Sequence, residues 1–575
     1  MRQETDHRNG TSSLSWPTTT TTMTTTMDTG LDNKPKAAVI ANGQHLTNGY
    51  HLSSGTAIRS QQQSTASIAD KVSIGDKGRT VNSKGRHINE DAPFHIVLLC
   101  YFSYVVLIMF GYLRDFLRQS GLERNPAAVE SNRDGYVKLY QSFESFYTRN
   151  IYRRICDSWN KPICSVPGST ITIIDRNTDN YNWTFTYPGT TTTAINMGSY
   201  NYLGFAETSG PIHRKVGECL DHYGVAQCST RQELGTTDVV QRLEEQTARY
   251  LGVEDCVIFG MGFATNATNI QTIAGKGSLI LSDELNHASI ILGARLTGST
   301  VRTFRHNNMA DLERKIRGYI VAGQPRTHRP WKRILILTEG IYSMEGSIVD
   351  LPELIRIKKK YNCYVYLDEA HSIGAIGPNG KGVCDYYGCD PNDIDLLMGT
   401  FTKSFGAAGG YIAGKKSAID YIRTHSYGDC YANAISPVIA TQISGVMSCL
   451  MGEDGTDDGE KRIKQLARNT QYFRQKLNQL GFIIYGNNDS PVVPLMLCFC
   501  PKIPAVIRLA YKKRLGFIGA GFPATSLTSG RVRFCVSASH TKEMLDKALE
   551  VMDEIGDKLE IKYSSRPLNK SEIIY

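Results

Sequence analysis

The stretch Leu396-Leu-Met-Gly-Thr-Phe-Thr-Lys-Ser-Phe-Gly-Ala-Ala-Gly-Gly410 joins an apolar strand to a loop of glycine, threonine and serine around Lys403. A partly desolvated lysine loses its proton and can then form an imine with an aldehyde. The hydroxyls of Thr400 and Thr402 suit a phosphate group, and the glycines let the backbone approach a ligand closely. A glycine-rich loop with one lysine is also a common turn, so its meaning depends on the sequence around it.

A second apolar strand, Tyr364-Val-Tyr-Leu-Asp-Glu-Ala-His371, ends in an aspartate 35 residues before Lys403. Pyridoxal phosphate (PLP) needs a carboxylate beside its pyridine nitrogen, because that charge keeps the nitrogen protonated and the ring able to accept electrons. Asp368 is therefore the candidate partner of the ring, although a helix N-cap would also explain it. His371 follows three residues later and is within reach of the ring's phenolic oxygen or of the substrate.

Two upstream runs complete this pattern. Ser282-Asp-Glu-Leu-Asn-His287-Ala-Ser places a histidine after a strand, where it can stack on the pyridine ring, although a lone histidine is more often structural. Val257-Ile-Phe-Gly-Met-Gly-Phe-Ala-Thr-Asn266 is a glycine-rich turn that opens a helix, and the backbone of Gly262 and Phe263 suits a phosphate. A dinucleotide fingerprint would need a third glycine where Thr265 stands, so a single phosphate is favoured.

The charge, the motifs and the cysteine spacing of the chain argue against a nucleic-acid helicase, a disulfide framework and a metal site. The net charge of +9 over 575 residues is mild. Asp368–His371 spells the DEAH of a helicase, but the phosphate-binding loop that such an enzyme needs is missing upstream, so we expect no nucleic-acid partner. The 14 cysteines form no C-x-x-C pair, which favours scattered reduced thiols over disulfides or a metal site.

The order of predicted elements indicates an α/β fold. The predicted strands are Cys256–Phe259, Leu279–Leu281, Ile334–Leu337, Tyr364–Leu367 and Leu396–Met398, with helices such as Leu354–Lys360 between them. Strands separated by helices imply a mainly parallel central sheet whose ligands bind at the strand ends, where the motifs stand. After Ser436, a predicted helix Arg462–Leu480 and strands Val492–Phe499 and Arg531–Val536 indicate a smaller α+β domain.

The N-terminal part has a different composition. Thr18–Thr26 is nearly all threonine, and the polar run to Lys84 predicts disorder, with a transit peptide as the alternative. Pro93–Leu113 is about twenty mostly apolar residues, enough for a helix of about 30 Å that crosses a bilayer. A buried core helix is the alternative. The arginines that follow, Arg114, Arg118 and Arg124, predict a cytosolic downstream part.

These changes predict five segments: a disordered tail (1–90), a membrane helix (91–115), an amphipathic linking segment (116–195), a PLP-binding large domain (196–435) and a small domain (436–575).

The chain from Ser142 to Tyr563 resembles the α-oxoamine synthases, a fold-type I PLP family that condenses an amino acid with an acyl-CoA. The resemblance is closest to the catalytic, long-chain-base subunit 2 branch of the eukaryotic serine palmitoyltransferases. It is carried by Gly198-Ser-Tyr-Asn-Tyr-Leu-Gly204, Cys228-Ser-Thr-Arg-Gln-Glu-Leu-Gly235, Ser282–Ser289, Thr338-Glu-Gly-Ile-Tyr-Ser-Met-Glu-Gly346, Asp368–Gly374 and Gly399–Gly410.

The resemblance implies a role for each matching residue. Lys403 would bind the cofactor and move the α-proton, Asp368 would pair with the pyridinium, and His287 would stack on the ring. His371 and Ser343 would lie near the phenolic oxygen. The other implied residues are Gly262, Phe263, Thr400 and Thr402 for the phosphate and Tyr200, Asn201 and Arg533 for the substrate, with Arg533 binding its carboxylate.

The implied reaction is L-serine plus palmitoyl-CoA giving 3-ketosphinganine, CoA and CO2 at the endoplasmic reticulum membrane. The implied partners are the long-chain-base subunit 1, small regulatory membrane subunits and membrane lipid. The run Gly235–Glu244, residues 427–438 and the absence of an arginine near Phe522 depart from relatives. Alternatives are 5-aminolevulinate synthase, glycine C-acetyltransferase and a diverged scaffold subunit, which would lack Lys403.

Overall fold

The computed structural model describes residues 90–122, 134–137, 146–180, 182, 184–522, 524–566, 572, 573 and 575. The predicted tail, 1–90, lies outside the described residues except for Glu90. All of the described residues belong to one compact unit, Val81–Tyr575.

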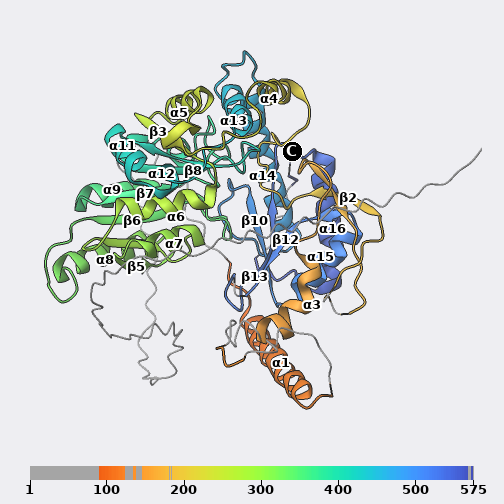
Figure 1. The fold of residues 1–575 in the computed structure, drawn as a ribbon. Helices are drawn as coiled ribbons and strands as arrows, with labels where there is room; N and C mark the ends of the chain where they lie inside the picture. Colours follow the sequence, from red (N-terminus) through yellow and green to blue (C-terminus); the bar gives the residue numbers. More distant parts are fainter. Residues whose placement is uncertain are drawn as a thin grey trace, which may run out of the picture. The chain divides into compact units, whose positions relative to one another are not determined.

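A seven-stranded sheet forms the centre of the fold, with strand order β3-β9-β8-β7-β6-β4-β5 (Figure 1). The strands are β3 (Asp255–Phe259), β4 (Leu279–Asp283), β5 (Thr300–Phe304), β6 (Ile334–Glu339), β7 (Tyr364–Asp368), β8 (Leu396–Thr400) and β9 (Gly410–Gly414). β4 to β8 run parallel, whereas β9 is antiparallel to both β3 and β8. The mainly parallel sheet is thus confirmed, and its one antiparallel strand, β9, lies between β3 and β8.

The central strands are mostly apolar up to their last one or two residues, because helices cover both faces of a parallel sheet. β4, β8 and β9 are buried at every residue. The covering helices include α5 (Asp238–Leu251), α6 (Gly262–Ile273), α7 (Ala288–Leu296), α8 (Met309–Ala322), α9 (Leu351–Tyr361), α11 (Lys416–His425) and α13 (Pro437–Leu450). Each of β3, β4 and β7 therefore delivers its last residues to one edge, where α6, α7 and the segment after Asp368 begin.

A second sheet, of order β10-β13-β12, lies in the C-terminal part. It consists of β10 (Val492–Cys498), β12 (Ile518–Ala520) and β13 (Gly530–Cys535), all antiparallel. The helices of this part are α14 (Asp458–Gln479), α15 (Lys502–Lys512) and α16 (Lys542–Leu559). Every residue of β13 is buried, so the strand carries Arg531 and Arg533 into the interior.

The predicted linking segment contributes structure of its own. β1 (Thr170–Ile174) pairs with β2 (Thr191–Asn196), and β2 pairs in parallel with β11 (Leu515–Gly516) of the C-terminal part. Trp159 also donates its indole N–H to the carbonyl of Gly519 at 2.9 Å. Residues between 159 and 196 are therefore attached to the C-terminal part, which composition alone did not indicate.

The apolar N-terminal helix, α1, runs from Phe94 to Gln119. Within the part of the chain that the structure describes, only this helix is long and apolar enough to cross a membrane, with a mean hydropathy of 2.3 over its most apolar window. It is not bare on all sides, because Cys100 and Tyr104 are buried against Cys500. Opposite this contact, side chains such as Phe102 (65% exposed) and Met109 (66% exposed) face outward.

Candidate active site

Lys403 lies in the loop between β8 and β9. Its Nζ is 3.5 Å from the hydroxyl oxygen of Thr400 and 5.7 Å from the centroid of the Tyr200 ring. Burial lowers the pKa of Lys403 to about 8, although Asp368 and Glu339 act in the opposite direction. A substantial fraction of this amine is therefore neutral at physiological pH, which is the form that reacts with an aldehyde.

Asp368 ends β7 and is held by two hydrogen bonds. Its Oδ2 accepts from the amide of Asn266 at 2.8 Å, and its Oδ1 accepts from the backbone N–H of Ala370 at 2.9 Å. Asn266 is itself oriented by Tyr366, whose hydroxyl donates to Asn266 Oδ1 at 2.8 Å. The carboxylate is 4% exposed and fixed in direction, as a partner for a ring nitrogen must be.

His287 is the N-cap of α7. Its Nδ1 lies 2.7 Å from the hydroxyl oxygen of Ser289, and its backbone N–H donates to Glu339. Burial lowers the pKa of His287 against the opposing effect of Asp368. A neutral imidazole fixed at one nitrogen is suited to lie flat against an aromatic ring, as the sequence predicts.

His371 faces Lys403 from the segment after β7. Its Nδ1 lies 2.8 Å from the hydroxyl of Tyr202, and the Tyr200 ring meets it edge-on with 5.2 Å between centroids. Burial, followed by the positive charges of Lys403 and Arg533, lowers the pKa of His371 well below its ordinary value. The imidazole is therefore neutral.

Arg533 is a buried cation with spare hydrogen-bonding capacity. It donates to the Tyr200 hydroxyl and to the Ser343 carbonyl (3.3 Å), and its guanidinium lies 4.7 Å from the centroid of the Tyr200 ring. Its Nε has no partner, and no described acid pairs with it. By contrast, Arg531 on the same strand is paired with Glu345 at 3.1 Å. Of the two arginines on this strand, Arg533 is thus the one available to bind a carboxylate.

The part of the site predicted to bind the phosphate is formed by the first residues of α6. The helix begins at Gly262 after Met261, which provides no side-chain cap, so the first N–H groups are open to a ligand. A Cβ at Gly262 would lie only 2.9 Å from the Thr400 methyl group. Thr402 donates its hydroxyl to Thr400 at 3.2 Å, and Phe263 is 40% exposed beside this opening.

Asn201 has a different environment from the other predicted residues. Its amide donates to the Pro167 carbonyl at 3.1 Å, and its Oδ1 accepts from the N–H of Ala206 at 3.2 Å. Both ends of the side chain are thus used within the protein. They shape the turn that carries Tyr200 and Tyr202 toward Arg533 and His371.

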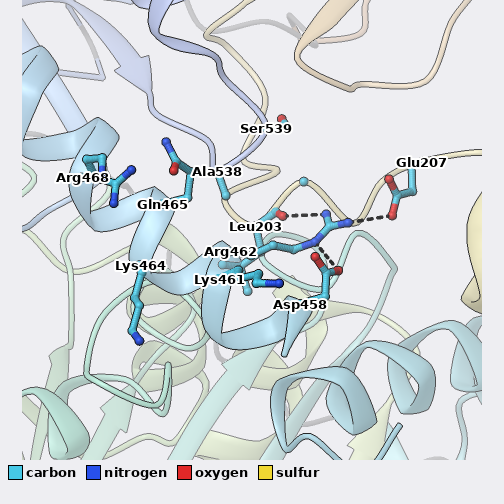
Figure 2. A pocket seen from close by; sticks show the side chains of 11 residues that line it. Leu203, Glu207, Asp458, Lys461, Arg462, Lys464, Gln465, Arg468, Ala538 and Ser539 are labelled. Carbon is cyan, nitrogen blue, oxygen red and sulfur yellow. Dashed lines mark hydrogen bonds and ion pairs between the residues drawn. The ribbon is translucent and has the colours of Figure 1, made fainter. Parts of the chain in front are cut away.

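Behind this turn lies a cavity of about 600 Å³, shown in Figure 2. Arg462 of α14 crosses it, donating to the Leu203 carbonyl at 3.1 Å and pairing with Glu207 at 3.2 Å and Asp458 at 2.8 Å (Figure 2). None of the predicted site residues lines this cavity. The hydrogen bond from Arg462 to Leu203 holds the Tyr200–Leu203 turn from the side away from the predicted site.

The structure adds residues that sequence reasoning did not assign. Asn266 and Glu339 contact Asp368 and His287 respectively, and Tyr202 contacts His371. All three stand inside quoted runs, but their type gave no signal, because asparagine, glutamate and tyrosine are common on surfaces. Their burial, at 1%, 4% and 0% exposure, was the missing information.

The groups brought together fit PLP. They are the Lys403 amine, which is partly neutral, the fixed Asp368 carboxylate, the His287 imidazole, whose pKa is lowered, and the uncapped start of α6 beside Thr400. These are an attachment point, a partner for the ring nitrogen, a ring support and an anion site.

Comparisons with known proteins agree. Residues 192–552 match the model of the aminotransferase class I and II family. The chain is 54% identical over 477 residues to serine palmitoyltransferase 3 of Homo sapiens, covering 83% of this chain and 86% of the relative. It is 47% identical over 510 residues to serine palmitoyltransferase 2 of Caenorhabditis elegans, covering 88% and 91%.

A solved structure described as SPT with a PLP internal aldimine superposes with a TM-score of 0.63 at 25% identity, covering 73% of this chain and all of that one. Its fold and the matched sequence lead to the same assignment. The chain belongs to the serine palmitoyltransferase family, within the enzymes that share the aminotransferase class I and II fold.

Proposed function

We propose that this chain is the catalytic subunit of a serine palmitoyltransferase, a PLP-dependent acyltransferase that joins L-serine to palmitoyl-CoA and releases 3-ketosphinganine, CoA and CO2. One observation carries the proposal: the Lys403 amine, with a pKa of about 8, lies in one buried site with a fixed Asp368 and an unpaired Arg533. The amine supports covalent attachment of the cofactor. The guanidinium supports an amino acid as substrate.

Pyridoxal phosphate, when bound, supplies an electron sink for the pair left at the substrate's α-carbon when a bond there breaks. Lys403 would be the attachment point of the cofactor, and its Nζ would be the group that accepts the α-proton. The Asp368 carboxylate would pair with the pyridine nitrogen and favour its protonated form, and Asn266 holds that carboxylate in place. His287 supports the ring, while the N–H groups at Gly262 and Phe263 and the hydroxyls of Thr400 and Thr402 hold the phosphate.

The remaining residues orient the substrate. Arg533 binds the serine carboxylate with two parallel hydrogen bonds, helped by Tyr200, whose hydroxyl accepts from the same guanidinium. His371 and Ser343 would hold the end of the cofactor that carries the phenolic oxygen, and the Ser343 carbonyl accepts from Arg533. His371 is neutral and so can accept or donate a proton there without leaving a buried charge.

We further propose that the enzyme is attached to the endoplasmic reticulum membrane by α1, with the catalytic part in the cytosol. The apolar face of α1 and the basic side chain of Arg118 near its C-terminus support this orientation. The proposed partners are the long-chain-base subunit 1 and small regulatory membrane subunits. The proposed domain limits are 196–435 for the PLP-binding domain and 436–575 for the small domain.

Coexpression with a long-chain-base subunit 1 tests the proposal directly. The membrane fraction should convert serine and palmitoyl-CoA to ketosphinganine, and Lys403→Ala should remove both the product and the visible absorbance of the bound cofactor. Offering glycine with succinyl-CoA or acetyl-CoA distinguishes the family alternatives. A preference for either pair over serine and palmitoyl-CoA would refute the substrate assignment. Activity that survives in Lys403→Ala would refute the catalytic assignment.

A further inference from the structure

Three acidic residues, Asp283, Glu339 and Asp368, end the neighbouring strands β4, β6 and β7 at the ligand edge of the central sheet, and only Asp368 has a role in the proposed reaction. Glu339 is the last residue of β6 and lies directly opposite Asp368 of β7 in the parallel register. It is 4% exposed. Burying a carboxyl group is unfavourable unless it makes specific contacts, so its contacts indicate its purpose.

Glu339 holds the backbone of His287. Its Oε1 accepts the N–H of His287 at 2.5 Å, and His287 is the N-cap of α7. The N–H of a capping residue has no partner inside the helix, so an acceptor supplied from outside the helix stabilises it. The contact therefore fixes the point at which the chain enters α7 and the direction in which the imidazole leaves the backbone.

The imidazole is fixed at its other end by a chain of hydrogen bonds. His287 Nδ1 lies 2.7 Å from the Ser289 hydroxyl, which accepts from Asn266 at 3.0 Å. The same Asn266 amide donates to Asp368 at 2.8 Å. The chain thus returns to Asp368, the strand neighbour of Glu339. His287 and Asp368, the proposed supports of the cofactor ring and its nitrogen, are therefore linked by one chain of hydrogen bonds.

We propose that Glu339 is a positioning residue that sets the plane of the His287 ring by accepting the backbone N–H of that histidine. This inference rests on the proposed function, in which His287 supports the cofactor ring. Glu339 acts through the protein and touches neither substrate nor cofactor in this role. An oxygen acceptor of the right length is all that the role requires.

The charges around Glu339 agree with an uncharged acceptor. The titratable groups that face it are Asp283 at the end of β4, Asp368, Lys403 and His287. Burial, followed by repulsion from Asp368, raises the pKa of Glu339 well above its ordinary value. Burial thus favours the uncharged carboxyl group, and glutamine reproduces both its shape and its acceptor.

The test compares Glu339→Gln and Glu339→Leu in the full chain coexpressed with its partner subunit. The main measurement is visible circular dichroism of the bound cofactor, which reports ring orientation without turnover. Glu339→Gln should keep the signal and kcat within about twofold of the wild type. Glu339→Leu should lower kcat by roughly fivefold or more, as expected when the His287 N–H loses its acceptor, and weaken the dichroic band with little change in the KM of serine.

Glu369→Gln is the matched control, because Glu369 is also a buried glutamate that accepts backbone N–H, from Val383, and does not contact His287. A dichroic band unchanged in Glu339→Leu would overturn the inference. If that variant does not fold, the pH titration of the visible band in Glu339→Gln decides. A midpoint within a few tenths of a unit of the wild type supports an uncharged acceptor, and a shift of about one unit or more overturns it.

A wild-type protein without any visible band would refute the proposed function itself. The two failures are therefore distinguishable in one experiment.

Discussion

Lys403 and Arg533 are both buried cations, and they are made useful in opposite ways. Burial lowers the pKa of the lysine so that part of it is neutral, whereas the arginine stays charged and lacks an acidic partner among the described residues. An amine is needed as a nucleophile and base, and a guanidinium is needed as a fixed charge. Lys403 and Arg533 are both basic residues in the sequence, and their surroundings in the fold give them different chemistry.

The rate at which the apoenzyme regains PLP should follow the protonation of Lys403. Its folded pKa of about 8 is lowered from 10.5, so the reactive neutral fraction rises with pH and levels off above about pH 9. Stopped-flow recording of the visible band between pH 6.5 and 9.5 measures this. A rate that does not change over the range would contradict the assigned pKa.

Arg533→Lys should weaken serine binding. Lysine keeps the charge but loses the fork that makes two parallel hydrogen bonds, so we expect the KM of serine to rise roughly tenfold or more while the KM of palmitoyl-CoA changes little. Arg531→Lys is the control on the same strand, because Arg531 is already paired with Glu345. Equal effects of the two substitutions on serine would argue against a special role for Arg533.

At the scale of elements, the sequence predicted β3, β4, β6, β7 and β8 of the central sheet but missed the parallel edge strand β5 and the antiparallel strand β9. β9 reads Gly-Tyr-Ile-Ala-Gly, too short and too glycine-rich to indicate a strand, and only pairing with β3 and β8 makes it one. Lys403 and Asp368 could be found because strand ends are visible in sequence. Glu339 could not be given a role, because its partner His287 is fixed by the folded register rather than by spacing.

Gly262→Ala should damage the start of α6 and with it the retention of PLP. The new Cβ would lie 2.9 Å from the Thr400 methyl group, and overpacking of this kind usually costs about 1–3 kcal/mol. Gly275→Ala is the control, since nothing lies within 4 Å of a Cβ there. Dialysis followed by absorbance measures cofactor loss. Equal retention in both variants would show that the close approach at Gly262 is unimportant.

The outward face of α1 should decide membrane attachment. Replacing both Phe102 and Met109 with glutamate places charges on the exposed side of the helix, and each charge in the middle of a bilayer costs about 2.5 kcal/mol or more. Carbonate washing should then release the protein, while leucine at both positions should leave it in the pellet. Retention of the double glutamate variant would mean that α1 is not the anchor.

At the scale of the whole molecule, buried histidines should make the free energy of unfolding fall as the pH is lowered. Burial lowers the pKa of His540 to about 4, and the unfolded value is 6.5. The unfolded chain therefore binds the proton first, and stability should fall as the pH drops from 6.5 to 4, by about 3 kcal/mol from this residue. In the folded state, His540 donates to the Asn196 carbonyl and accepts from Ser537, so a second proton would break the latter contact.

Thermal unfolding at pH 7.5 and 5.5 measures this dependence. His540→Gln should narrow the difference in Tm between the two conditions, whereas His425→Gln, at an exposed position, should leave the difference unchanged. A pH dependence that survives in His540→Gln would assign acid sensitivity to other groups. His371, whose pKa burial also lowers, would be the next to test.

The position of Arg533 has a consequence for the order in which the protein is made. The seven strands of the central sheet are complete at Gly414, whereas Arg533 leaves the ribosome 119 residues later. Synthesis at about 5–20 residues per second separates the two events by several seconds or more. During that interval the nascent chain contains every proposed cofactor contact and lacks the group for the substrate carboxylate. If Arg533 has the role proposed for it, selectivity for an amino acid is therefore acquired last, when β13 joins its sheet.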